Sequence, residues 1–173
     1  MKSKKSSLTL SNTHYIVLAI DPGYERLGIS VLKKEKGKDS LMYSDCLTTK
    51  KTLPHSKRLT YLGTSLKALL LTYRPNALAI EKLFFNTNQK TALLVAEVRG
   101  VILYEAGLVN IPVYEYSPGE IKVAVTGYGK SDKLQIKAMV QRLLPIQKKI
   151  QYDDEYDAIA VGLTHMAIYR AVN

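Results

Sequence analysis

The sequence has almost no cysteine and no long apolar run. Cys46 is the single cysteine among 173 residues, so no intrachain disulfide can form, which is typical of a reducing compartment. A metal site in this chain would use oxygen ligands, with imidazole as the alternative. No apolar stretch approaches the roughly 18 residues of a membrane span, and the basic first ten residues lack the apolar core of a secretory signal. We therefore expect a cytoplasmic protein that does not associate with a membrane.

Acidic residues are also in short supply. The chain has 15 Asp and Glu against 25 Lys and Arg, which gives a formal net charge of +10. In a small domain, this excess predicts a polyanionic partner, with nucleic acid as the first candidate and an anionic membrane or simple solubility as alternatives. The length is typical of one domain. We expect residues 1–14 to form a disordered basic arm and residues 15–173 to form a single domain.

Hydrophobic patterning predicts five strands and several helices. Residues 15–20, 28–33 and 41–47 are expected to form three consecutive strands, the first two joined across residues 21–27. Later elements are expected as strands at 77–80 and 111–116, and as helices at 59–73, 88–107, from 118, at 132–144 and from 153 towards 170. The order predicts an α/β fold in which a five-stranded mixed sheet is flanked by helices on both faces.

The expected helix at 88–107 carries apolar residues on nearly every side. Such a pattern is typical of a helix that is buried all round. In a domain of this size, a second copy of the chain can cover part of the helix. We therefore predict a homodimer.

Four acidic residues lie at the ends of apolar elements. Asp21 follows the strand at 15–20, Glu81 follows the strand at 77–80, and Asp154 and Asp157 open the last helix. Three elements that each deliver an acid at one end predict that the acids meet. Two like charges about 4 Å apart repel by roughly 4 kcal/mol at an effective dielectric of about 20, so a divalent cation is expected among them. Oxygen ligands beside phosphate favour Mg²⁺ or Mn²⁺, with two ions per site, and a basic surface around them favours a nuclease.

Each acid has a structural alternative when it is taken alone. Asp21 begins an Asp-Pro-Gly turn, and Glu81 could pair with Lys82 or another base. Acids in the first turn of a helix interact favourably with the helix dipole. In the last helix, Asp153 is an alternative to Asp154. The three-residue spacing between Asp154 and Asp157 favours Asp154, because it places both side chains on one face of the helix.

Two further patterns are not interpreted as sites. His165 lies about two helical turns after Asp157, and packing or capping is the favoured interpretation of this side chain. Residues 124–131 nearly spell a phosphate-binding loop, but the first position is Ala124 instead of glycine, and the segment follows a predicted helix instead of a strand. Nucleotide hydrolysis is therefore not expected.

Seven segments, in order along the chain, resemble the RuvC-type Holliday junction resolvases. They are Asp21-Pro22-Gly23 with Gly28 following, residues 79–84, Arg99-Gly100, and residues 116–118, 126–133, 139–144 and 157–165. The match extends from about residue 15 to residue 170. The resemblance implies a ribonuclease H-like fold, a dimer, and Mg²⁺-dependent paired nicking of four-way DNA junctions in recombination and repair.

The resemblance also implies roles for individual residues. It assigns catalysis and metal binding to the four acids named above. It implies that Phe84 inserts against bases near the crossover and that Lys122 and Lys133 contact DNA phosphates. The alternative for Phe84 is an aromatic side chain of the core, with Phe85 in the inserting role. The alternative for the two lysines is a solvated helix face. Direct contact with a RuvA–RuvB branch-migration complex is left open.

Two other functions remain as alternatives. One is a noncatalytic protein that binds DNA junctions, although concentrated negative charge facing phosphate argues against it. The other is a related ribonuclease H-like nuclease that acts on RNA or on other branched DNA. Cleavage assays on different nucleic acids separate these functions.

Overall fold

A computed structural model gives the structure of residues 14–83 and 89–172. The strands are β1 His14–Asp21, β2 Arg26–Glu35, β3 Lys38–Thr48, β4 Ala77–Glu81 and β5 Val113–Tyr116. The helices are α1 His55–Tyr73, α2 Gln89–Leu108, α3 Pro118–Thr126, α4 Lys133–Leu143 and α5 Asp153–Val172. Strand β1 begins at His14, one residue earlier than the expected domain boundary.

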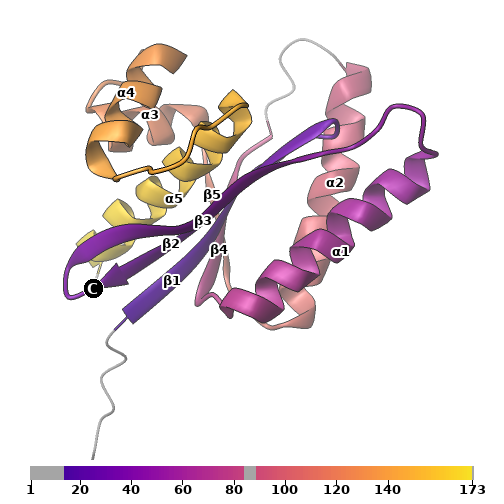
Figure 1. The fold of residues 1–173 in the computed structure, drawn as a ribbon, viewed down its shortest axis with the longest axis horizontal. Helices are drawn as coiled ribbons and strands as arrows, with labels where there is room; N and C mark the ends of the chain where they lie inside the picture. The colour runs from indigo at the N-terminus through magenta and orange to yellow at the C-terminus, as the bar shows by residue number, and fades with distance from the viewer. Residues whose placement is uncertain (1–13, 84–88, 173) are drawn as a thin grey trace, which may run out of the picture.

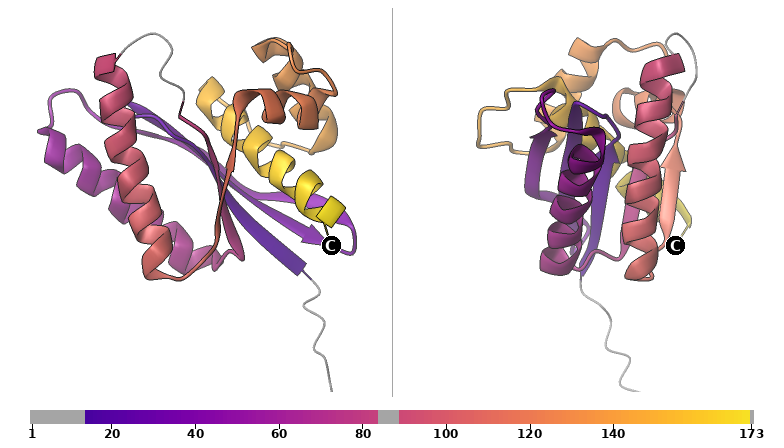
Figure 2. Two further views of the ribbon diagram at one scale, coloured as in Figure 1. Left: turned by 180° about the vertical axis from the view of Figure 1, so that it is seen from behind. Right: turned by 90° about the vertical axis from the view of Figure 1, so that its right-hand side faces the viewer.

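The strands form one mixed sheet in the order β3-β2-β1-β4-β5. Strands β1, β2 and β3 are antiparallel neighbours, whereas β4 pairs parallel with β1 and β5 pairs parallel with β4. Helices α1 and α2 cover one face of the sheet, and α3, α4 and α5 lie on the other (Figures 1 and 2). The predicted five-stranded mixed sheet with helices on both faces is confirmed.

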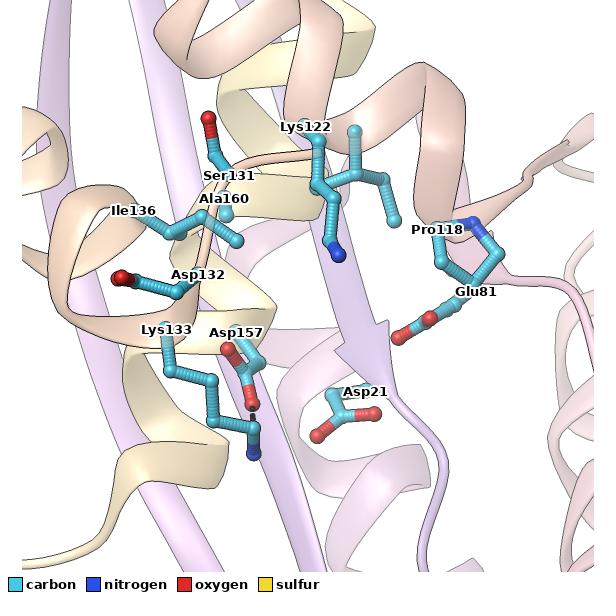
Figure 3. Close-up of a pocket in the computed structure, with 11 residues that line it drawn as sticks. Asp21, Glu81, Pro118, Lys122, Ser131, Asp132, Lys133, Ile136, Asp157 and Ala160 are labelled. Carbon is cyan, nitrogen blue, oxygen red and sulfur yellow. Dashed lines mark hydrogen bonds and ion pairs between the residues drawn. The ribbon is translucent and has the colours of Figure 1, made fainter. Parts of the chain in front are cut away.

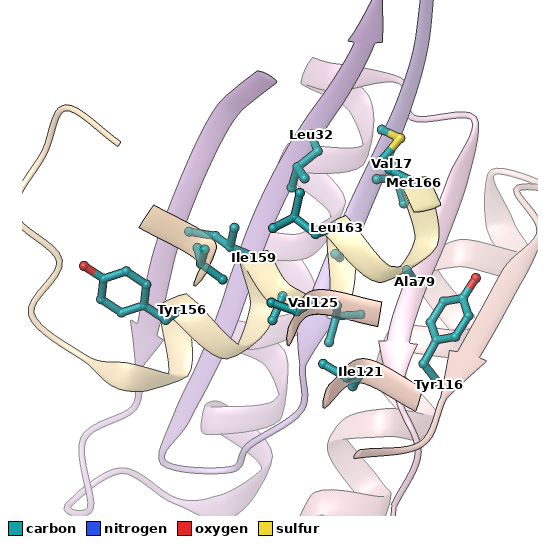
Figure 4. Packing of buried hydrophobic residues seen from close by; sticks show 14 of the residues in the cluster. Val17, Leu32, Ala79, Tyr116, Ile121, Val125, Tyr156, Ile159, Leu163 and Met166 are labelled. Atoms are coloured by element: carbon teal, nitrogen blue, oxygen red, sulfur yellow. The ribbon is translucent and has the colours of Figure 1, made fainter. Parts of the chain in front are cut away.

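The central strand β1 is buried on both faces. Because side chains alternate along a strand, Val17 and Ala19 join the core beneath α5, while Leu18 and Ile20 join the core beneath α1 and α2. Figure 4 shows the α5 side of this packing, where side chains of α3 and α5 meet those of the strands. With cores on both sides, the sheet forms a rigid platform for residues at its strand ends.

In the single chain, α2 is buried on one side only. Val98, Ile102 and Ala106 are at most 2% exposed and pack against the sheet, while Leu93 and Tyr104 are each 64% exposed. The predicted homodimer would cover these exposed apolar side chains, and it stays a prediction.

His165 is a packed residue of α5. Its Nε2 lies 2.9 Å from the hydroxyl of Tyr15, and its Nδ1 lies 2.9 Å from the hydroxyl of Tyr116. Burial, with a smaller contribution from Lys34, lowers the pKa of His165 to about 4. The imidazole is therefore neutral and joins β1, β5 and α5, which agrees with the packing interpretation.

Some predictions fall on parts of the chain that the structure does not describe. Residues 1–13, which make up nearly all of the expected basic arm, lie outside the described residues, as do Phe84 and Phe85. Among the helices that are described, none is both long and apolar enough to span a membrane.

Candidate active site

Two of the four acids lie side by side at the ends of neighbouring strands. Strands β1 and β4 are parallel neighbours with Ile20 opposite Ile80, so Asp21 and Glu81 follow at the same edge. The end of β4 is held in place because Arg99 of α2 donates a 2.6 Å hydrogen bond from Nη1 to the carbonyl oxygen of Glu81. The structure therefore brings these two acids together, as the sequence predicted.

The first turn of α5 lies over the hairpin of β1 and β2. Gly28 pairs with Asp21 in the sheet, and a Cβ atom at Gly28 would lie only 1.9 Å from the carbonyl oxygen of Asp154. Only a residue without a side chain permits this close approach. The contact positions the start of α5, which carries Asp154 and Asp157, beside the end of β1.

Three acids face a common pocket. The pocket has a volume of about 430 Å³, and its lining includes Asp21, Glu81 and Asp157 together with Lys122 and Lys133. Figure 3 shows the three carboxyl groups pointing into the same space, with the two lysines projecting from α3 and α4. The acids come from β1, β4 and α5, so the predicted convergence is seen for three of the four.

Asp154 occupies a different position from the other acids. It is not among the residues that line the pocket. Its Oδ2 lies 3.1 Å from Nε of Arg26, the first residue of β2. Asp154 nevertheless lies close enough to add to the negative potential that acts on Asp21 and Asp157.

The pKa values of the pocket acids reflect burial and mutual repulsion. Burial raises the pKa of Asp21 well above its usual 3.8, and the charges of Glu81, Asp157 and Asp154 raise it further. Burial also raises the pKa of Glu81, and the charge of Asp157 adds to this rise. The pKa of Asp157 is raised by burial and lowered in part by Lys133. The protein thus holds negative charge where water solvates it poorly.

The two predicted phosphate-binding lysines border these acids. Lys133 places Nζ 3.3 Å from Oδ2 of Asp157, and its side chain is 74% exposed. The charge of Asp157 is the main cause that raises the pKa of Lys133. Both Lys133 and Lys122 line the pocket that the three acids face, so positive charge borders the acidic groups.

The donor set fits a hard divalent cation. Within residues 14–83 and 89–172, no three carboxylate, imidazole or thiolate groups already surround one point closely enough to hold a metal ion. Three carboxylates with raised pKa values nevertheless face one pocket, and oxygen donors of this kind suit Mg²⁺ or Mn²⁺. Ion binding would draw the side chains together and relieve their repulsion.

Sequence reasoning missed several residues of the site. Arg26 falls in residues 21–27, which were expected to join the first two strands. Ser131 ends the rejected phosphate loop at 124–131, and Asp132 begins the helix expected at 132–144. That loop follows α3, as expected, and Ser131 and Asp132 line the acidic pocket. The available signals were the charged pair Glu25-Arg26 at the start of β2 and the segment 126–133, which is one of the seven segments named above.

Comparison with known proteins assigns the chain to a family. The family model described as "Crossover junction endodeoxyribonuclease RuvC" matches residues 17–165. The chain belongs to the RuvC family. Its relatives include RuvC of Syntrophomonas wolfei, 41% identical over 89% of this chain and 90% of the relative. RuvC of Thermosipho melanesiensis is 45% identical over 84% of this chain and 93% of the relative.

Solved RuvC structures have the same fold. T. thermophilus RuvC in complex with a Holliday junction substrate aligns with a TM-score of 0.85 at 30% identity, covering 91% of this chain and 96% of that chain. The yeast mitochondrial Holliday junction resolvase aligns with a TM-score of 0.65 at 16% identity, covering 87% of this chain and 77% of that chain, a likeness in fold alone. The ribonuclease H-like fold predicted from the motifs is confirmed.

Asp21 should make the metal-free protein less stable as pH rises. Below its usual pKa of 3.8 the carboxyl is protonated in both the folded and the unfolded state. Above that pH, the unfolded state releases the proton first, so stability falls until the raised folded pKa is passed. We expect Asp21→Asn to increase metal-free stability at pH 7 and to have little effect near pH 4.

Urea unfolding of the parent and the variant from pH 4 to pH 8 measures this difference. Added Mg²⁺ should stabilise the parent and have much less effect on Asp21→Asn. Parallel stability profiles in the two proteins, or equal responses to Mg²⁺, would contradict the assignment of Asp21 to a repulsive metal site.

Proposed function

We propose that this chain is a structure-selective endonuclease that resolves Holliday junctions by paired, symmetric, Mg²⁺-dependent nicks in homologous recombination and DNA repair. The observation that carries the proposal is the convergence of Asp21, Glu81 and Asp157 on one pocket in a chain of net charge +10. Membership of the RuvC family supports it, and so does the likeness to a RuvC structure that contains a junction.

The proposed site uses the four acids to hold two Mg²⁺ ions, with Mn²⁺ as a substitute. When bound, such ions activate a water on one side of a phosphodiester and stabilise the leaving oxygen on the other. Asp21 and Glu81 supply ligands from fixed strand ends, and Asp157 supplies one from α5. Asp154 is proposed as the fourth ligand, and its 21% exposed side chain makes it a more enclosed donor than the 66% exposed Asp153.

The lysines are proposed to orient the DNA backbone. Lys133 neutralises part of the charge of Asp157 and keeps three-quarters of its side chain exposed. When phosphate enters the pocket, Lys133 and Lys122 can donate to it from two helices. Phe84 is proposed to stack against bases near the crossover, which would offset about 1 to 3 kcal/mol of lost stacking per base.

A homodimer is part of the same proposal. A junction presents two equivalent strands, and a two-fold dimer presents two equivalent sites. The exposed apolar side chains of α2, Leu93 and Tyr104 among them, supply an apolar surface for the second copy. A cytoplasmic location is a further expectation of this proposal, and direct contact with a RuvA–RuvB complex is left open.

A panel of nucleic acids tests the proposed function. We expect cleavage of a synthetic four-way junction in Mg²⁺, and little cleavage of a linear duplex or of an RNA–DNA hybrid of the same sequence. Preferred cleavage of the hybrid would favour the related ribonuclease H-like nuclease. Junction binding without any nicks would favour the noncatalytic binder.

Lys133→Ala should weaken junction binding and reduce its salt dependence. Removing one phosphate contact lowers the slope of log affinity against log salt by about 0.9. Fluorescence anisotropy with a labelled junction, measured at several salt concentrations without Mg²⁺, gives the slope. Lys67→Ala, which removes an exposed lysine from α1 on the other face of the sheet, is the matched control. Equal slopes for Lys133→Ala and the parent would remove the proposed contact.

A further inference from the structure

Within residues 14–83 and 89–172, Arg26 is the only basic residue of the sheet that forms an ion pair with one of the four acids. It is the first residue of β2 and follows the turn that connects Asp21 of β1 to β2. Its Nε lies 3.1 Å from Oδ2 of Asp154, with 53% of the Arg26 side chain exposed. The guanidinium carbon also lies 5.6 Å from the centroid of the ring of Tyr152, the residue immediately before α5.

The geometry indicates what this ion pair does. Solvent-exposed ion pairs contribute at most about 1 kcal/mol to stability. A contribution to stability alone therefore does not explain the pairing of Arg26 with Asp154. The ion pair joins Nε of Arg26 to Oδ2 of Asp154. The ring of Tyr152 limits the movement of the guanidinium, and Gly28 brings the backbone of Asp154 against β2. The ion pair holds the carboxylate, the ring contact restrains its partner Arg26, and the close approach at Gly28 places the backbone that carries it.

We propose that Arg26 is a positioning residue that holds the carboxylate of Asp154 in the orientation in which it binds the metal ion. The inference rests on the proposed function, since it assumes that Asp154 is a ligand. Carboxylates that ligate metals are themselves usually held by a second hydrogen-bonding group, and loss of that group commonly weakens metal binding by about 10- to 100-fold. Arg26 acts through Asp154 and needs no contact with the DNA or with the ion.

The sign of the effect distinguishes positioning from simple electrostatics. Removing a positive charge next to an acidic site should strengthen cation binding if charge alone matters. Removing a group that orients a ligand should weaken it. Arg26→Gln therefore gives opposite results under the two interpretations, and weaker binding is expected only if Arg26 positions Asp154.

The experiment is a titration of the metal-free full chain with Mn²⁺ and no DNA, followed by the relaxation of water protons. We expect Arg26→Gln to weaken Mn²⁺ binding by about tenfold or more, Asp154→Asn to weaken it at least as much, and Arg26→Lys to recover part of the loss. In the Asp154→Asn background, Arg26→Gln should have no further effect.

The control removes an equivalent charge from the segment between β3 and α1. Lys51 pairs with Glu25, with Nζ 3.2 Å from Oε1, and neither residue lines the acidic pocket. Lys51→Gln should leave Mn²⁺ affinity unchanged. Urea unfolding of each metal-free variant confirms that the folded state is being titrated.

The outcomes separate the inference from the function on which it rests. Unchanged or stronger Mn²⁺ binding by Arg26→Gln, or a further loss in the Asp154→Asn background, would overturn the positioning role alone. An unchanged affinity in Asp154→Asn would remove Asp154 from the metal site and the inference with it. Failure of the parent to bind Mn²⁺ would overturn the proposed metal-dependent function itself.

Discussion

Replacing Asp21 with asparagine should abolish cutting of a four-way junction and leave junction binding intact. Asp21 ends β1 beside Glu81 and faces the same pocket as Asp157. Asparagine keeps the size of the side chain but removes the charged oxygen ligand. Loss of about 4 kcal/mol of transition-state stabilisation corresponds to roughly a thousandfold lower rate. Single-turnover cleavage and a gel-shift assay without Mg²⁺ measure the two properties separately.

Glu35→Gln is the matched control for Asp21→Asn. Glu35 is an acid at the opposite end of β2, where it pairs with Lys33 at 3.1 Å. Its neutralisation should leave both cutting and binding unchanged. Cutting by Asp21→Asn at the rate of the parent would contradict the metal-site assignment, whereas loss of binding as well would point to a damaged fold.

Gly28→Ala should cause the second large loss, through the position of α5. The new Cβ would lie 1.9 Å from the carbonyl oxygen of Asp154 and 3.2 Å from Cβ of Ala158. Because the close neighbour is backbone, α5 must move away from β2, and overpacking of this kind costs about 1 to 3 kcal/mol or more. The shift also moves Asp154 and Asp157, so nicking should fall far more than junction binding.

Gly119→Ala is the control variant for Gly28→Ala. Gly119 lies in α3, and a Cβ there would meet nothing within 4 Å. Alanine should therefore leave stability the same or raise it by up to about 1 kcal/mol. Urea unfolding and single-turnover cleavage report on both variants. A Gly28→Ala protein with the stability and nicking rate of the parent would show that the contact between β2 and α5 does not position the acids.

The convergence of the acids was predictable in part from sequence. Apolar runs ending in Asp21 and Glu81 indicated buried strands with acids at their ends, and the structure agrees. The sequence did not contain the reason why these ends meet, which is that β4 pairs parallel with β1 with Ile20 opposite Ile80. Periodicity tells which face of an element is buried, but strand order depends on tertiary packing.

Ion pairs around the site were not predictable for a related reason. Arg26 and Asp154 are far apart in sequence and meet only because α5 packs over the start of β2. The pairing of Lys133 with Asp157 likewise depends on how α4 lies against α5. Long, partly exposed side chains leave no periodic pattern in a sequence, so their partners appear only in the folded structure.

One hairpin shows a signal that was present but not recognised. The strands were expected at 28–33 and 41–47, with a longer connection between them, whereas the turn between β2 and β3 consists of Lys36 and Gly37. Both residues have positive φ, 49° and 78°, as a tight two-residue turn with this strand twist requires. Strand β3 therefore begins earlier than expected, at Lys38.

Mapping the nicks that the full chain makes in a synthetic four-way junction tests the central claim most directly. With each strand end-labelled in turn, we expect Mg²⁺-dependent cuts at equivalent positions in two opposite strands, and none when the ion is withheld. The claim would be contradicted by junction binding without nicks, by cuts at unrelated positions in the four strands, or by cutting that needs no divalent cation.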